Sequence, residues 1–330
     1  MSKIHYRLLL AGITLCIAVF SVFWWSERRK ANATPDQRPY RIEVLFKSYD
    51  RPPAFWSNVG DGIMAAEKEF GVTCNITAPA NEGDIDTQIS LMEAAIARKP
   101  DAIILAAADY EKLAPVCSQA AAAGILLLTV DSDVDSSARK AFVGTNNVEI
   151  GQKLAQLLSE QIGDEALFGV ISHVEGTATA TDRLSGLTGS TPNADTRMAG
   201  FAYCNGSEEL ARQYTIQMLA EHPDIKGMVG LNESSALGIA RALTELGKAG
   251  EISLVVCDSS EKQVQFLENG TINACVVQNP FSMGYLSVAN AVRLLNRQSV
   301  EPITYTDSVI VRRENLNTAS YQQLIIPFTP

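Results

Sequence analysis

Histidine is scarce in this chain of 330 residues, which contains only three. The sequence has no Gly-x-Gly-x-x-Gly or phosphate-binding loop motif, and no serine or cysteine lies in a recognisable nucleophile elbow. Side chains with metal-ligand spacing are also missing, since the carboxylates of "EGDID" at residues 82–86 are typical of a helix start. We therefore expect no enzyme activity, no catalytic residue, no metal and no cofactor, while a calcium site stays open.

Cysteine is sparse as well, and the five cysteines outside the N-terminal region are scattered without Cys-x-x-Cys spacing. An odd number in this arrangement excludes a zinc site and a disulfide framework. Most of them are expected to be small buried hydrophobic residues. A disulfide between Cys257 and Cys275, each in a predicted strand, stays open. The five are Cys74, Cys117, Cys204, Cys257 and Cys275.

Basic residues are outnumbered, with 27 Lys and Arg against 37 Asp and Glu, and the net charge is −10. Nucleic acid is excluded as a partner on this ground, because binding to phosphates needs a basic face. Low-complexity tracts and charge blocks are absent, so most of the chain is expected to fold. Its length suits one large domain or two of ordinary size.

One long apolar run is present, at residues 8–25, and basic residues flank it on both sides. A run of about 18 residues reaches the lower range for spanning a bilayer, and the paired Trp24 and Trp25 suit the membrane interface. Residues 1–30 are therefore predicted to be a signal anchor, or a signal peptide cleaved near Ala33. Residues 31–40 are predicted to be a polar linker. The part of the chain after residue 40 is expected to lie outside the cytoplasm.

Short apolar runs then alternate with segments of helical period. The predicted strands are 42–46, 72–77, 102–106, 125–130, 141–143, 167–172, 198–203, 227–231, 253–257 and 272–278. The predicted helices are 56–70, 85–98, 112–123, 149–162, 207–221, 234–246 and 261–268. This alternation is typical of α/β folds whose parallel sheets are buried on both faces. Ten strands are more than one compact α/β domain normally contains, and the alternation of strands and helices starts again after Asn147. We therefore expect two similar α/β domains.

The residues that follow the predicted strands are mostly Asp, Asn, Gln, Arg, Thr and aromatic, with little Lys and almost no His. Ligands of open parallel sheets bind outside the carboxyl ends of the strands. Amides and carboxylates hydrogen-bond to pairs of hydroxyls, and rings pack on the C–H face of a sugar. The inventory therefore favours a neutral, polyhydroxylated ligand.

Eight segments in order carry a resemblance to a known family. They are "AFWSNVGDGIMAAEKEFG", "DTQISLMEAAIARKPDAIILAAAD", "AAAAGILLLTVDS", "FVGTNNVEIGQKLAQLL", "GTATATDRLSG", "HPDIKGMVGLNESSALGIARAL", "VVCDSS" and "VVQNPFSMGYLSV". Over residues 41 to about 315 the chain resembles type I periplasmic binding proteins of the ribose/galactose cluster, which are related to the effector domains of LacI-type repressors.

The resemblance implies two Rossmann-like lobes joined by three crossovers, with a ligand cleft between them. It places the crossovers near residues 146–147, 278–279 and 306–307. The N-terminal lobe would then comprise residues 41–146 and 279–306. The C-terminal lobe would comprise residues 147–278 and 307–330.

The resemblance also assigns ligand-binding roles in the first lobe. Phe55 and Trp56 match an aromatic pair of which at least one ring packs on the sugar. Asp131 matches an aspartate that binds hydroxyls. The alternatives are a hydrophobic staple at the helix start for the two rings and a turn-shaping role for Asp131.

In the second lobe the resemblance carries ligand-binding roles to Arg183, Asn232, Asp258 and Gln278. Each has a structural alternative. Arg183 would pair with a surface carboxylate, and Gln278 would serve the hinge alone. Asn232 would cap the helix at 234–246 while facing the cleft, and Asp258 would cap the helix at 261–268.

The chain departs from the family at several positions. Ser132 and Thr181 stand where basic residues are common, and Gly206 stands where an aromatic residue often closes the pocket. In the stretch after Arg183, a shortened or broken helix is predicted by Gly186, Gly189 and Pro192. A standard pentose ligand is therefore not assumed.

The resemblance implies a solute-binding protein that captures a sugar-like ligand and delivers it to the permease of an ABC transporter. An alternative is a ligand-sensing co-receptor for a membrane histidine kinase or chemoreceptor. A LacI-type regulator would need a basic helix-turn-helix at the N-terminus, where this sequence has an apolar run.

Overall fold

The computed structural model describes residues 38–48, 55–318 and 321. The predicted signal anchor at residues 1–30 and most of the predicted linker lie outside these ranges. No helix within the described ranges is long and apolar enough to cross a bilayer. The chain divides after Pro39 by its internal contacts, and the helices and strands below belong to the unit Tyr40–Pro330.

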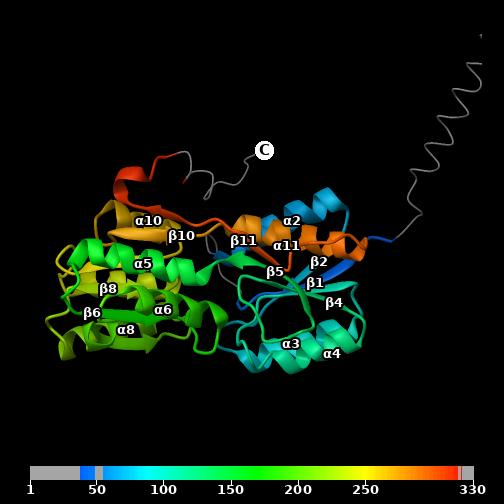
Figure 1. Ribbon diagram of the computed structural model, residues 1–330, viewed down its shortest axis with the longest axis horizontal. Coiled ribbons are helices and arrows are strands. Elements are labelled where there is room, and N and C mark those ends of the chain that lie inside the picture. The colour runs from blue at the N-terminus through cyan, green and yellow to red at the C-terminus, as the bar shows by residue number, and fades with distance from the viewer. Residues whose placement is uncertain (1–37, 49–54, 319–320, 322–330) are drawn as a thin grey trace, which may run out of the picture. The chain divides into compact units, whose positions relative to one another are not determined.

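The first lobe is built on a six-stranded sheet in the order β11-β5-β4-β3-β1-β2 (Figure 1). Its strands, all parallel, are β1 (Arg41–Leu45), β2 (Thr73–Thr77), β3 (Ala102–Leu105), β4 (Leu126–Val130), β5 (Arg139–Thr145) and β11 (Ile303–Thr306). The apolar runs of the sequence form the central strands, because both faces of the sheet are covered. The covering helices are α2 (Phe55–Phe70), α3 (Ile85–Ala97), α4 (Ala114–Ala122) and α11 (Pro280–Leu295).

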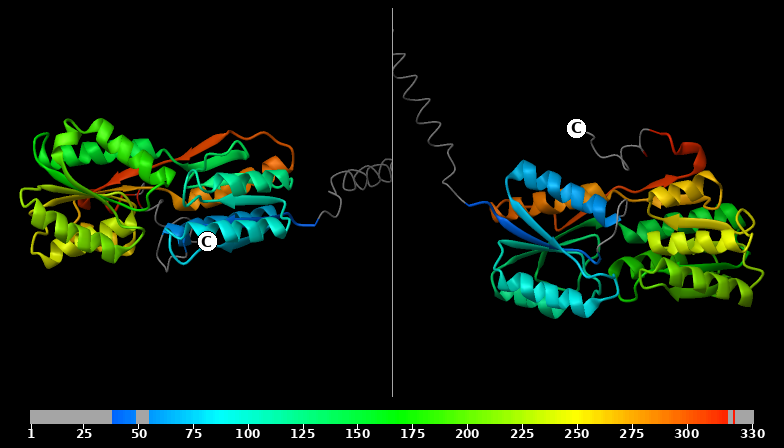
Figure 2. Two further views of the ribbon diagram at one scale, coloured as in Figure 1. Left: turned by 90° about the horizontal axis from the view of Figure 1, so that it is seen from below. Right: turned by 180° about the vertical axis from the view of Figure 1, so that it is seen from behind.

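The second lobe repeats this plan, with a six-stranded sheet in the order β12-β10-β9-β8-β6-β7. Its strands are β6 (Phe168–Ser172), β7 (Met198–Tyr203), β8 (Gly227–Gly230), β9 (Ser253–Cys257), β10 (Ala274–Val277) and β12 (Val309–Val311). Its helices are α5 (Asn147–Ile162), α6 (Ala178–Ser190), α7 (Ala194–Arg197), α8 (Glu208–Glu221), α9 (Glu233–Glu245) and α10 (Glu261–Glu268), and Figure 2 shows helices on both faces of each sheet.

Two α/β lobes with mainly parallel sheets are confirmed, with one correction. Strand β12 runs antiparallel to β10, so the second sheet is mixed at its edge. The chain passes between the sheets three times, after β5, after β10 and after β11. The two edge strands β11 and β12 therefore come from one short C-terminal stretch.

In each lobe, a glycine allows a helix that reaches the cleft to pack closely against a neighbouring helix. In the first lobe, a Cβ atom added at Gly62 of α2 would lie 2.0 Å from the carbonyl oxygen of Phe281 in α11. In the second, a Cβ atom at Gly186 of α6 would lie 2.1 Å from the carbonyl oxygen of Val148 in α5. The helix backbones are thus in direct contact, which fixes the positions of α2 and α6.

The break predicted after Arg183 is confirmed in part. Helix α6 continues through Gly186 and Gly189 and ends at Ser190, two residues before Pro192, and the short α7 follows. The proline ends the helix because it has no N–H to donate and its ring crowds the preceding turn. The glycines do not break it, because α5 packs against α6 at Gly186.

Cys257 and Cys275 do not form the disulfide that the sequence left open, because both cysteines are free. In the parallel register Cys275 lies opposite Val256, the neighbour of Cys257. Successive side chains of a strand point to opposite faces, so the two sulfurs lie on different sides of the sheet. Cys257 belongs to the core under α5, and Cys275 belongs to the core on the other face.

Candidate functional site

A cavity of about 670 Å³ lies where the carboxyl ends of strands from both lobes meet. This volume falls in the range of about 300–1,000 Å³ that is typical of small-molecule sites. All the residues predicted to bind ligand line it: Phe55, Trp56, Asp131, Arg183, Asn232, Asp258 and Gln278. The lobes contact each other beside the cavity, where the backbone N–H of Tyr110 donates to the carbonyl of Gly176 at 2.8 Å.

Phe55 and Trp56 are the first two residues of α2. The Trp56 ring is 3% exposed and stacks on Phe46 with ring centroids 4.9 Å apart. Its indole Nε1 donates to Glu82 Oε1 at 3.1 Å. Phe55 is half-buried and meets Trp56 edge-on at 5.1 Å. Trp56 is therefore held firmly as part of the core, and Phe55 presents the more exposed ring.

An ion pair that the sequence analysis missed lies beside these rings. Lys47 Nζ, just beyond β1, is 3.1 Å from Asp131 Oδ2, and both side chains are 4% exposed. The same ammonium lies 5.5 Å from the centre of the Trp56 ring. Asp131 itself follows β4 in a left-handed conformation, with φ of 60°. Lys47 could have been found, because it directly follows the first predicted strand.

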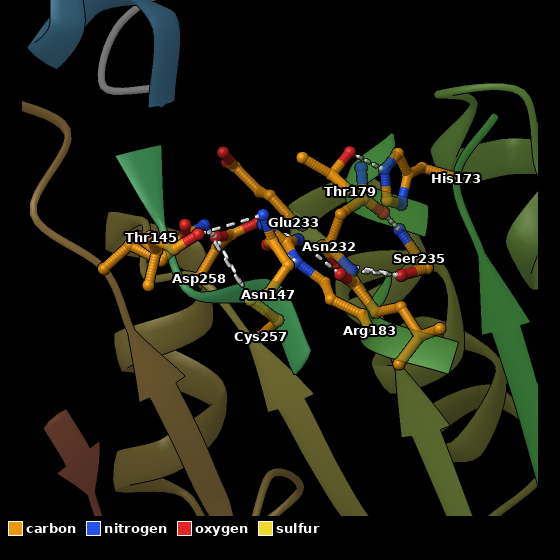
Figure 3. Close-up of polar contacts among 12 residues, drawn as sticks. Thr145, Asn147, His173, Thr179, Arg183, Asn232, Glu233, Ser235, Cys257 and Asp258 are labelled. Carbon is orange, nitrogen blue, oxygen red and sulfur yellow. Dashed lines mark hydrogen bonds and ion pairs between the residues drawn. The ribbon is translucent and has the colours of Figure 1, made fainter. Parts of the chain in front are cut away.

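Arg183 enters from α6 and is 3% exposed. Its Nε donates to Asn147 Oδ1 at 2.8 Å, and its Nη1 donates to the carbonyl of Leu231 at 2.6 Å. Asp258 Oδ2 lies 3.9 Å from the same Nη1. Figure 3 shows the side chains of Arg183, Asn147 and Asp258 together. The alternative of pairing with a surface carboxylate is therefore wrong, because every one of these partners lies in the interior of the second lobe.

Asp258 also follows its strand in a left-handed conformation, with φ of 72°. Its Oδ1 accepts from Gln278 Nε2 at 2.5 Å, and its Oδ2 accepts from the backbone N–H of Glu233 at 3.0 Å. It therefore binds the N-terminus of α9, and the alternative that it caps α10 is wrong. Ser260 caps α10, with its hydroxyl accepting from the N–H of Gln263.

Asn232 caps α9, as expected, while lining the cavity. Its Oδ1 accepts from the backbone N–H of Ser235 at 3.0 Å, and Ser235 Oγ accepts from the N–H of Asn232 at 2.9 Å. The helix begins at Glu233, one residue earlier than predicted. This reciprocal pair fixes the Asn232 side chain at the cavity wall.

His173, Thr179 and Glu82 also line the cavity, and the sequence analysis gave them no role. His173 Nε2 and Thr179 Oγ1 are 2.8 Å apart, and the same hydroxyl accepts from Lys47 Nζ of the other lobe at 3.5 Å. Burial lowers the pKa of His173 well below 6.5, and the nearby Lys47 and Arg183 lower it further. The imidazole is thus neutral near pH 7, so it brings no charge to the cavity.

Comparison with known proteins agrees with this geometry. The family model described as periplasmic binding protein domain matches residues 42–299. A D-ribose/D-allose-binding protein of Pseudomonas aeruginosa is 28% identical over 315 residues, which cover 91% of this chain and 95% of that protein.

Two crystal structures have the same fold. A sugar transporter from Clostridium phytofermentans has a TM-score of 0.78 and 34% identity, over 83% of this chain and 99% of that one. An ABC transporter solute-binding protein from Agrobacterium vitis with bound D-fucose has a TM-score of 0.81 and 30% identity, over 87% of this chain and 100% of that one. The chain therefore belongs to the periplasmic binding protein family.

Proposed function

We propose that this chain is an extracytoplasmic binding protein that captures a sugar and presents it to an ABC importer. The observation that carries the proposal is the cavity between the lobes, which combines polar side chains with Phe55 and Trp56. Relatives named for ribose and allose, and a neighbour with bound fucose, support a monosaccharide as the ligand.

The ligand would bridge the lobes and so favour the closed arrangement over the open one. In the first lobe Asp131 and the rings of α2 would bind it, and in the second Arg183, Asn232 and Asp258 would do so, with Gln278 at the crossover. A ligand that contacts both lobes binds the closed form better, so it shifts the population toward that form. The proposed lobe boundaries are residues 41–146 with 279–306 and residues 147–278 with 307–330.

Residues 1–30 would tether the protein to the outer side of the cytoplasmic membrane, or would be removed after export. The proposal rests on the apolar run at residues 8–25. Detection of the N-terminal residue of the mature protein, extracted from membranes and from the soluble fraction, separates the two outcomes.

The sugar-binding proposal is tested by thermal unfolding of the full chain with a panel of monosaccharides and polyols. At least one is expected to raise the melting temperature, because a ligand at 100 times its Kd stabilises the folded state by about 2.7 kcal/mol. If amino acids or purines stabilise the chain and sugars do not, the ligand class is wrong.

A further inference from the structure

Glu82 stands out among the charged groups of the cavity. Within the described part of the chain, Lys47 is paired with Asp131, and Arg183 lies near Asp258. Glu82 forms no ion pair with a described residue, although its charge contributes to the raised pKa of Arg183. Its Oε1 accepts from Trp56 Nε1, and its Oε2 is buried without a hydrogen-bond partner among the described residues. A buried carboxylate oxygen left in this way costs free energy until a donor reaches it.

Glu82 lies at the boundary between the two lobes. It comes from the segment between β2 and α3, and it faces Gly206 of the second lobe. A Cβ atom added at Gly206 would lie 3.4 Å from Glu82 Cβ and 3.7 Å from Oε2. Gly206 has a φ of 73°, a conformation that favours glycine. A Cβ atom at Gly206 would thus be in ordinary van der Waals contact with Glu82, so the carboxylate lies against the second lobe at this glycine.

The charge of the whole cavity has the same sign as Glu82. Among the described residues, six carboxylates line it against three cations, which gives these residues a formal charge of −3: Glu82, Asp131, Glu208, Glu233, Asp258 and Glu261 against Lys47, Arg183 and Lys262. Gln278 Oε1 is a second buried acceptor without a partner in the described chain. His173 Nδ1 is also buried without a partner among the described residues, and it donates or accepts according to the tautomer of the ring. Two of these three positions in the wall are thus acceptors, and the net negative charge repels anions.

We propose that Glu82 is a specificity-determining residue, which accepts a hydrogen bond from a hydroxyl or ammonium group of the ligand and excludes anionic sugars. The inference rests on the proposed sugar-binding function. It adds that sugars with a carboxylate or phosphate are poor ligands, whereas neutral sugars and amino sugars fit. Two acceptor positions, Glu82 Oε2 and Gln278 Oε1, call for donors on the ligand.

The test uses isothermal titration of the full chain with two matched sets of probes. One set is D-glucose, D-glucosamine and D-glucuronate, and the other is D-galactose, D-galactosamine and D-galacturonate, with D-ribose and D-allose as further neutral probes. The wild type is expected to bind a neutral or amino sugar at least about tenfold more tightly than the corresponding uronate. A uronate that binds as tightly as its neutral counterpart overturns the inference.

Glu82→Gln is the decisive variant because it has nearly the same shape. The amide oxygen can keep the bond from Trp56 Nε1, while the amide nitrogen replaces the free acceptor with a donor. The discrimination against uronates is expected to fall at least about tenfold, since bonds to charged groups are about twice as strong as neutral ones. Glu93→Gln, at an exposed position of α3 outside the cavity, is the matched control and is expected to discriminate like the wild type.

The outcomes separate the two proposals. If sugars bind but Glu82→Gln keeps the full discrimination, the role of Glu82 is wrong and sugar binding stands. If none of the neutral sugars, amino sugars and uronates binds the wild type, the proposed sugar-binding function fails. If only amino sugars bind, the carboxylate selects an ammonium, and if neutral and amino sugars bind alike, it selects a hydroxyl.

Discussion

Substitution of Gly186 by alanine tests how tightly the cleft-bearing helix of the second lobe is fixed. The new Cβ would lie 2.1 Å from the carbonyl oxygen of Val148 and 3.1 Å from the Cα of Gly151, which are backbone atoms of α5. Neither can rotate away, so α5 and α6 must move apart. Overpacking of this kind costs about 1–3 kcal/mol. The helical preference of alanine over glycine offsets about 0.5–1 kcal/mol of that cost.

Gly189→Ala is the matched control in the same helix, because a Cβ atom there meets nothing within 4 Å. It should be neutral or stabilising by up to about 1 kcal/mol. Thermal unfolding without ligand measures the difference in melting temperature between the two variants. In chains of 150–250 residues, each kcal/mol of stability shifts the melting temperature by about 2–4 °C. The reasoning is refuted if Gly186→Ala melts at or above Gly189→Ala.

Gly186→Ala should also weaken sugar binding, because α6 carries Arg183, whose Nε donates to Asn147 of α5 at 2.8 Å. A shift between the helices lengthens this bond and moves the guanidinium relative to the cavity. Titration with the sugar that stabilises the wild type is expected to show a higher Kd for Gly186→Ala and an unchanged Kd for Gly189→Ala.

Two further predictions concern buried groups. Asp258→Ala removes the carboxylate that accepts from Gln278 Nε2 and from the N–H of Glu233 and that lies 3.9 Å from Arg183 Nη1, so it should cost about 3–5 kcal/mol of stability without ligand. Asp258→Asn keeps one acceptor and should cost less, and equal unfolding of Asp258→Ala and wild type in urea would refute this account. His173 has a folded-state pKa well below 6.5, so the unfolded chain takes up the proton first as the pH falls. Stability should therefore drop by up to about 1.4 kcal/mol per pH unit below about 6.5, and His173→Gln should show a shallower decline between pH 7.5 and 5. Identical pH slopes for the two proteins would contradict the prediction.

The alternation of apolar and helical segments was enough to predict the central strands, because a parallel strand buried on both faces is an unbroken apolar run. Strands β11 and β12 were not predicted from this pattern, since they are only four and three residues long, whereas the longer edge strands β2 and β7 were predicted. Helix α11 was not predicted from its period either, although the family resemblance included its first residues. These elements depend on contacts with segments distant in the sequence.

The predicted site residues gather at one cavity, but their partners needed the structure. Lys47 directly follows the first predicted strand, but its pairing with Asp131 is a tertiary contact, and Glu82 has no local pattern that marks it. The carboxylates at residues 82–86 were interpreted as a helix start, and Asp84 does cap α3 through the N–H of Thr87. Glu82, two residues earlier, instead accepts from Trp56. Adjacent carboxylates with different roles cannot be told apart without the tertiary contacts.

The edge strands have a consequence for biosynthesis. Strand β11 at residues 303–306 completes the first sheet, and β12 at residues 309–311 completes the second. Neither sheet has its full set of strands until the ribosome has made residues 303–311. The N-terminus therefore emerges long before either lobe has its full set of strands. Such a nascent chain stays incompletely folded through most of its synthesis, which leaves time for it to be threaded through a membrane before it becomes compact.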